Sequence, residues 1–140
     1  MTKRLLGVAL LLLVAACSGD GSTSSNLGPE LAAGRETFSS TCATCHGGNG
    51  EGGSAPALDT ILETFGSCDD QMTWISLGSL RWEEEVGPTY GDNDKEIPAV
   101  MPSFSESLSV TEIAQVAAFE RHQFGGAPAE QTLTDCGLSP

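Results

Sequence analysis

The pentapeptide Cys42-Ala43-Thr44-Cys45-His46 is the feature that most constrains this 140-residue sequence. Two thiols three positions apart, followed directly by an imidazole, form the attachment signature of a c-type haem. Each thiol can add to one vinyl group of the porphyrin and form a thioether, and the spacing brings His46 beneath the iron as proximal ligand. The segment therefore predicts one covalently bound haem c, held by Cys42, Cys45 and His46.

Two other roles for this pentapeptide, a redox dithiol and part of a zinc site, fit the rest of the sequence poorly. A thioredoxin-type dithiol belongs near a βαβ pattern, and the sequence shows none. A structural zinc site needs four ligands. The remaining candidates, none of which lies at zinc-finger spacing, are Cys17, Cys68, Cys136 and His122.

Residues 1–16 have the pattern of a secretory signal peptide that is removed from the mature protein. Lys3 and Arg4 supply its positive start, and the ten-residue apolar run that follows is too short to span a bilayer stably. The segment Val14-Ala15-Ala16-Cys17 resembles the lipobox of bacterial lipoproteins, in which the cysteine is lipidated and becomes the new N-terminus. The alternative is an ordinary signal peptide with an incidental Cys17, although an A-x-A cleavage site prefers a residue smaller than Val14.

With Cys17 lipidated, residues 17–29 should form a lipid anchor and a flexible tether. We therefore expect the protein in the bacterial cell envelope, lipid-anchored and facing the periplasm or the outside of the cytoplasmic membrane. A contact with the membrane should then come from the N-terminal lipid alone.

Removal of residues 1–16 would leave a strongly acidic protein. Four basic residues and all 19 acidic residues would remain, so the net charge would be −15. Such a surface repels nucleic acid and anionic lipid headgroups. We expect a monomer whose redox partner proteins carry a basic docking patch, although the charge can equally serve solubility.

Two cysteines, Cys68 and Cys136, are left once haem and lipid have taken the other three. In an exported, oxidising compartment such a pair predicts a disulfide. This bond would tie the C-terminal tail to the middle of the domain and stabilise it by about 4 kcal/mol through chain entropy. The connectivity itself does not follow from the sequence.

Apolar residues at helical spacing predict short helices between residues 30 and 126. The first should span about residues 30–40 and deliver the chain to the pentapeptide. The many glycines of residues 47–53 suit a loop that wraps closely around a bulky group. A short helix can follow at residues 58–65.

The middle of the chain predicts one more helix and a long loop. Asp69 and Asp70 can cap the helix, whose inward side chains would include Met72, Ile75 and Leu80. The prolines and glycines of residues 87–102 indicate an extended loop.

The last predicted helix has the clearest boundaries. Ser109 and Glu112 form a capping box at its start, and two glycines, Gly125 and Gly126, end it. Residues 127–140 should form an irregular C-terminal tail.

A haem iron bound by His46 has a sixth position that methionine sulfur can fill. After processing, the methionines are Met72 and Met101. Met72 falls within a helical pattern, where a core side chain is the simpler interpretation. Met101 ends the long loop, and Pro102 stiffens its approach. We therefore predict Met101 as the distal ligand, in preference to Met72 and to His122.

Residues 31–124 resemble a class I cytochrome c, a small α-helical electron carrier with one haem. The matching segments are residues 33–38, 42–47, 55–58 and 101–104, together with Phe119. The resemblance implies an all-α fold of about four to five short helices around one covalently bound haem, formed here by residues 30–126. It also implies that the Pro56 carbonyl accepts the ring N–H of His46 and orients the ring. Gly34 would allow the terminal helices to approach closely.

Two departures from this family bear on function. Residues 68–100 are unlike the corresponding segment of the family, and the lysines that some members carry around the exposed haem edge are absent. The resemblance therefore leaves the reduction potential and the docking surface open.

The function that these features imply is outer-sphere electron transfer by an electron carrier rather than an enzyme. With His46 and Met101 both on the iron, no position remains for a substrate. One alternative is a haem subunit of a larger respiratory or dehydrogenase complex. Another is an open-site haem enzyme or gas sensor, which would require Met101 to be off the metal.

Overall fold

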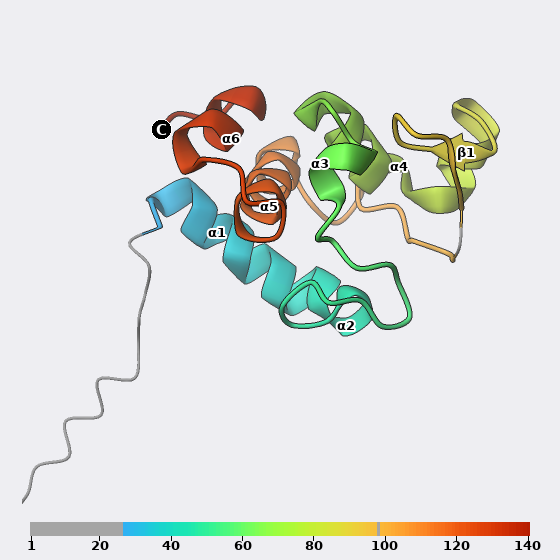
Figure 1. Cartoon of the computed structure of the whole chain (residues 1–140), viewed down its shortest axis with the longest axis horizontal. Helices are drawn as coiled ribbons and strands as arrows, with labels where there is room; N and C mark the ends of the chain where they lie inside the picture. Colours follow the sequence, from blue (N-terminus) through green and yellow to red (C-terminus); the bar gives the residue numbers. More distant parts are fainter. Residues whose placement is uncertain (1–26, 98) are drawn as a thin grey trace, which may run out of the picture.

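Helices dominate the computed structural model, which describes residues 27–97 and 99–140 (Figure 1). The predicted signal peptide, the lipidation site Cys17 and most of the tether lie outside these residues. Within them, no helix combines the length and the apolar character needed to cross a membrane.

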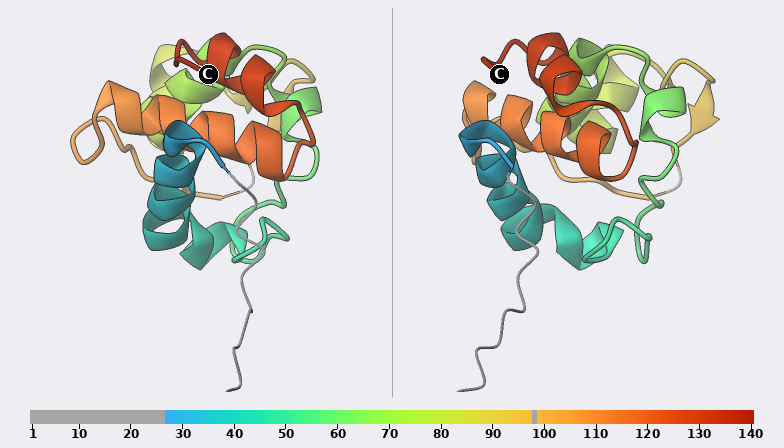
Figure 2. Two further views of the ribbon diagram at one scale, coloured as in Figure 1. Left: turned by 90° about the vertical axis from the view of Figure 1, so that its left-hand side faces the viewer. Right: turned by 60° about the vertical axis from the view of Figure 1, so that its left-hand side comes forward.

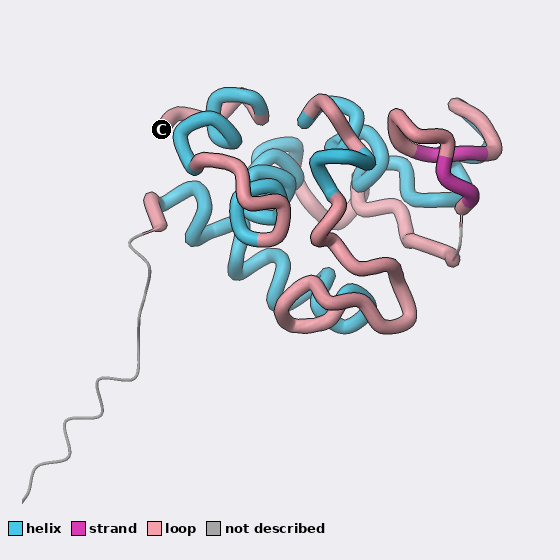
Figure 3. Tube along the Cα trace, in the orientation of Figure 1, coloured by secondary structure: helices cyan, strands magenta, loops and turns pink. Residues whose placement is uncertain are grey.

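The helices in chain order are α1 (Pro29–Thr37), the π-helical segment η1 (Phe38–Cys42), α2 (Ala43–His46), α3 (Ile61–Thr64), α4 (Cys68–Glu85), α5 (Val110–Gln123) and α6 (Ala129–Asp135). Two short strands, β1 (Thr89–Tyr90) and β2 (Lys95–Glu96), pair in an antiparallel hairpin. Helices and loops make up the rest of the described chain (Figure 3). The predicted all-α fold is confirmed, and the hairpin lies within the segment expected to be an extended loop.

The centre of the fold is the crossing of α1 over α5 (Figure 2). Gly34 lies at the crossing, where a β-carbon would come within 2.8 Å of the Phe119 Cβ and would overlap the Gln115 carbonyl. One turn to either side, Leu31 and Phe38 are each 1% exposed. A side chain at Gly34 would therefore force the two helices apart and open the core.

The capping box predicted for α5 is present. The Ser109 hydroxyl accepts the Glu112 N–H at 3.3 Å, and the Glu112 carboxylate accepts the Ser109 N–H at 2.8 Å. These bonds satisfy two of the N–H groups that a helix start leaves free. The helix ends before Gly126, whose φ of +76° suits glycine.

Helix α4 differs from the prediction in its cap and in one inward residue. Ser67 rather than Asp69 is the cap, because its hydroxyl accepts the Asp70 N–H at 3.1 Å. Leu80, predicted to face inward, is 66% exposed. Gly78 breaks the helical geometry with φ +66° and ψ 175°, and after the break Ser79 and Trp82 are the buried residues of the helix.

Residues 127–140 are not irregular as predicted, because they contain α6. Its Thr132 and Leu133 are buried, as is Cys136 immediately after it. So short a helix is marginal by itself, since helix formation needs a costly nucleus. Packing against α5 supplies the stability that the local sequence lacks.

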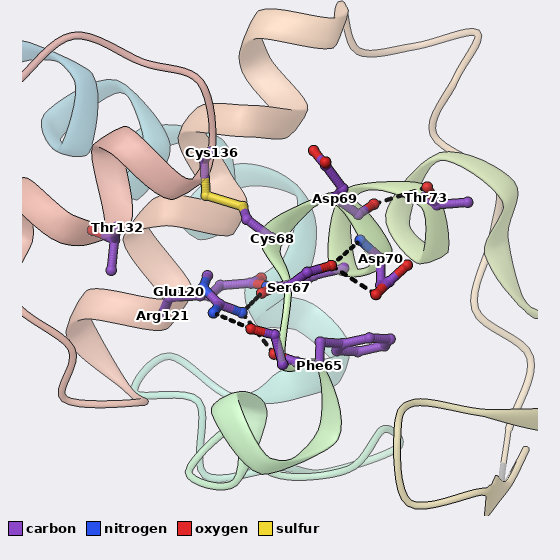
Figure 4. The surroundings of a disulfide bond; sticks show 12 residues. Phe65, Ser67, Cys68, Asp69, Asp70, Thr73, Glu120, Arg121, Thr132 and Cys136 are labelled. Carbon is purple, nitrogen blue, oxygen red and sulfur yellow. Dashed lines mark hydrogen bonds between the residues drawn. A yellow bond between two sulfur atoms is a disulfide. The ribbon is translucent and has the colours of Figure 1, made fainter.

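A disulfide between Cys68 and Cys136 joins the start of α4 to the end of α6 (Figure 4). The two Cα atoms are 5.2 Å apart, and 68 residues separate the cysteines along the chain. The bond holds the C-terminal helix against the body of the fold.

Candidate haem site

A cavity of about 580 Å³ lies between the pentapeptide with the loop that follows it, helices α3 and α4, and the segment that leads to α5. This volume is in the range of ligand and cofactor sites, roughly 300–1,000 Å³. Its lining is predominantly apolar, and the largest apolar side chains on it are Leu58, Ile61, Phe65, Trp74, Ile75, Tyr90 and Phe104.

Both cysteines of the pentapeptide line this cavity as free thiols. Cys42 ends η1 and Cys45 lies in α2, so a continuous helical run delivers both to one wall. Burial raises the pKa of the Cys42 thiol to about 12, with smaller contributions from Glu120 and Cys45. Cys45 is exposed at the cavity rim.

His46 reaches the cavity with its ring already oriented. Its Nδ1–H donates to the Pro56 carbonyl at 2.9 Å, which leaves Nε2 as the nitrogen available to a metal. The intervening loop folds back on the pentapeptide, since Gly52 N–H donates to the His46 carbonyl at 2.7 Å and Ala55 N–H to the Cys45 carbonyl at 3.2 Å. These bonds fix where Pro56 lies relative to the ring.

Met101 also lines the cavity, from the segment between the hairpin and α5. Its N–H donates to the Ser79 hydroxyl at 3.0 Å, and its carbonyl accepts the Ser79 N–H at 2.9 Å. Gly78 makes this close contact possible, because a β-carbon there would lie only 2.6 Å from the Met101 carbonyl oxygen. The sequence interpretation did not assign a role to Gly78 or Ser79.

The two alternative ligands considered above lie elsewhere. Met72 packs against the hydrophobic core, and His122 hydrogen-bonds through Nδ1 to the Ala127 carbonyl at 2.8 Å. Neither residue is among those that line the cavity.

One wall of the cavity is aromatic. Trp74 stacks on Tyr90 with ring centroids 4.5 Å apart, and Phe65 lies 6.1 Å from Tyr90. Behind them, Trp82 packs edge-on against Trp74 and donates its indole N–H to the Thr89 carbonyl at 2.8 Å. Apart from Phe65, this wall comes from residues 68–100, the segment that departs from the family, and the contact of Trp74 with Tyr90 joins α4 to the hairpin.

Lys95 is the one basic side chain among the lining residues. Its ammonium donates to the hydroxyls of Thr64 at 2.7 Å and Thr60 at 3.4 Å. A cationic group held by neutral partners keeps its charge available for an anion. Lys95 would suit the carboxylate groups that a haem carries.

Two polar residues of the lining, Gln71 on α4 and Glu120 on α5, were missed by the sequence interpretation. The signal was present for Glu120, because it lies on the helical stripe of Ile113, Val116 and Ala117. All of these residues are buried. Acidic residues are rarely buried without a partner, so an acidic residue on a buried stripe indicates a candidate functional position.

Taken together, the attachment and ligand groups around the cavity fit a c-type haem. Two free thiols at the attachment spacing, an imidazole with one nitrogen free and a thioether share a single apolar space of adequate size. Sulfur and imidazole ligands in an apolar pocket match the requirements of haem iron.

The match to a protein-family model agrees with this chemistry. The family model for cytochrome c matches residues 31–123. Among solved structures, the chain is similar to the c-type cytochrome XoxG from Methylobacterium extorquens AM1, with 19% identity over 76% of this chain and 67% of that chain and a TM-score of 0.49. No curated protein matches. Because the family model covers well over half of the sequence and includes the haem-attachment residues, this chain belongs to the cytochrome c family, whose members carry covalently bound haem c and transfer electrons.

Proposed function

We propose that this protein is an exported, membrane-anchored, monohaem electron carrier whose iron is bound by His46 and Met101. The observation that carries the proposal is that both side chains, and both thiols of the attachment motif, line the same cavity. A substrate would then have no open position on the metal.

The residues around the cavity would hold the haem, orient its ligands and keep water away from it. Cys42 and Cys45 would anchor the haem covalently, and the Pro56 carbonyl keeps the His46 ring in the orientation and tautomer that ligation needs. Two hydrogen bonds, from the Met101 N–H to the Ser79 hydroxyl and from the Ser79 N–H to the Met101 carbonyl, limit how far Met101 can move when the charge in the cavity changes. Bound haem supplies the one-electron couple, and histidine–methionine ligation raises its potential.

The membrane anchor is proposed from Cys17, which would carry the lipid in a bacterial cell envelope. Cytochrome c domains are typically exported, and the disulfide between Cys68 and Cys136 suits an oxidising compartment. These features support a localisation on the periplasmic or outer side of the cytoplasmic membrane.

Docking to redox partners is proposed to be transient and guided by charge. The chain has 19 acidic and six basic residues, so a partner with a basic patch would be attracted at low ionic strength. Electron-transfer rates with such a partner should fall as salt is added. A permanent subunit would instead remain with its complex after detergent extraction.

The experiment that tests the ligand assignment is a spectrum of the matured protein and of Met101→Ala. Wild type should show the weak far-red sulfur–iron band when oxidised and no shift when carbon monoxide is added to the reduced form. Met101→Ala should lose the band and bind carbon monoxide, whereas Met72→Ala, the matched control, should keep the wild-type spectrum. An unchanged far-red band in Met101→Ala would show that this ligand is misassigned. Carbon monoxide binding by wild type would favour an open-site enzyme or sensor.

A further inference from the structure

Helix α5 contributes one side chain to the lining of the haem cavity, the carboxylic acid Glu120. Glu120 is 6% exposed and lines the cavity. Its carboxyl group accepts one hydrogen bond from a side chain, from Gln71 Nε2 at 2.9 Å. A single neutral donor compensates only part of the cost of burying a negative charge.

The adjacent cation does not neutralise this carboxyl group. Arg121 donates through Nη1 to the Phe65 carbonyl at 2.8 Å and to Gln71 Oε1 at 3.3 Å, and through Nη2 to the Gly66 carbonyl at 3.3 Å. Figure 4 shows the Arg121 bonds to the backbone beside Glu120. In the described part of the chain, Glu120 forms no salt bridge. Glu120 is therefore a buried acid, and the guanidinium of its neighbour Arg121 is bound to other groups.

The surroundings make the protonation of Glu120 responsive to charge in the cavity. Burial raises the pKa of its carboxyl group to about 8, and the Gln71 hydrogen bond offsets a part of this. Both forms are then accessible near neutral pH. The other titratable groups that line the same cavity are Cys42, Cys45, His46, Asp59, Tyr90 and Lys95. Beside Glu120 on α5 lies Arg121, on which Asp135 of α6 acts.

We propose that Glu120 takes up a proton when the haem is reduced, so that electron transfer by this protein is coupled to proton transfer. An electron supplied by the donor protein lowers the charge in the cavity by one. The Glu120 carboxylate then takes one proton from solvent and forms an O–H bond, which restores the buried charge. Like charges in a low-dielectric space repel strongly, so the carboxyl group has a higher pKa in the reduced protein than in the oxidised one. The proposal rests on haem occupying this cavity.

The direct test is the midpoint potential of the matured protein as a function of pH. At a pH between the pKa values of Glu120 in the oxidised and the reduced protein, reduction brings in one proton per electron. Each pH unit then changes the equilibrium constant of reduction tenfold. For a one-electron couple a tenfold change corresponds to about 59 mV. The potential of wild type should fall as pH rises through the neutral range, with a slope that approaches this limit. A potential that stays constant across that range would overturn the proposal.

Two variants test whether the pH dependence of the midpoint potential comes from Glu120. Glu120→Gln keeps the size and the hydrogen-bonding capacity of the side chain but cannot titrate, so its potential should not change with pH in the same window. Glu83→Gln removes an equivalent charge from an exposed position on α4 and should retain the wild-type slope. A slope that persists in Glu120→Gln would mean that another group, such as a haem carboxylate, takes the proton.

A measurement on wild type keeps the test decisive even where Glu120→Gln fails to mature. The infrared difference spectrum between reduced and oxidised protein should contain the C=O stretch of a protonated carboxylic acid in the reduced state, and reduction in weak buffer should take up protons. Neither signal depends on how the iron is ligated. An intact far-red band without proton uptake would therefore refute the role of Glu120 and leave the proposed electron carrier standing.

Discussion

Removing the disulfide should cost this domain a large part of its stability. The double variant Cys68→Ala/Cys136→Ala leaves the haem-attachment cysteines untouched. It also avoids burying new hydroxyl groups at two positions that are only 2% and 4% exposed. The sequence separation of 68 residues sets the size of the effect. The chain-entropy relation for a loop of this length gives about 4 kcal/mol at 25 °C.

A loss of this size is measurable and easy to distinguish from a surface effect. Small domains have unfolding free energies of about 5–15 kcal/mol, and for a domain of this size 4 kcal/mol corresponds to a fall in Tm of about 10–20 °C. Guanidinium unfolding of the matured protein, followed by helical circular dichroism, gives the free energy of unfolding directly. With the haem kept reduced by ascorbate in every sample, a thiol reductant should lower the stability of wild type by a similar amount and leave the double variant unchanged. A difference below about 1 kcal/mol between the two proteins would refute the reasoning from loop entropy.

Two further substitutions test the helices that frame the site, with the same unfolding assay. Gly34→Ala should destabilise the protein by about 1–3 kcal/mol, because its β-carbon would meet the backbone at Gln115; unchanged stability would show that α1 and α5 can separate at little cost. Ser109→Ala should cost about 1 kcal/mol by removing the cap that accepts the Glu112 N–H. Its control, Ser39→Ala, loses only an exposed bond to a carbonyl and should stay within about 0.5 kcal/mol of wild type.

The predictions that held for the fold are those that rest on local chemistry. The capping box of Ser109 and Glu112 and the helix that leads to the pentapeptide depend on residues within a few positions of one another. Such local signals can be recognised in the sequence because they do not depend on distant residues.

The predictions that failed depend on packing between distant segments. Leu80 faces solvent just after the break at Gly78, where Ser79 and Trp82 are the buried residues instead. Gly78 adopts its non-helical geometry where the Met101 segment packs closely against it. Helix α6 has few local signals of its own and forms against α5. Periodicity cannot reveal either effect, because the partner lies far away in the sequence.

The sequence by itself determined the chemistry of attachment, because Cys42, Cys45 and His46 are neighbours in the chain and their spacing alone matches the porphyrin. Only the tertiary structure decided which distant groups join them in the cavity. Ser79 holds Met101 there across 22 residues, and the packing of α4 against α5 buries Glu120 with Gln71 as its hydrogen-bond donor. The physical reason is that burial and dielectric environment belong to the packed core rather than to any residue, so the state of a buried acid cannot be read from its position in the chain.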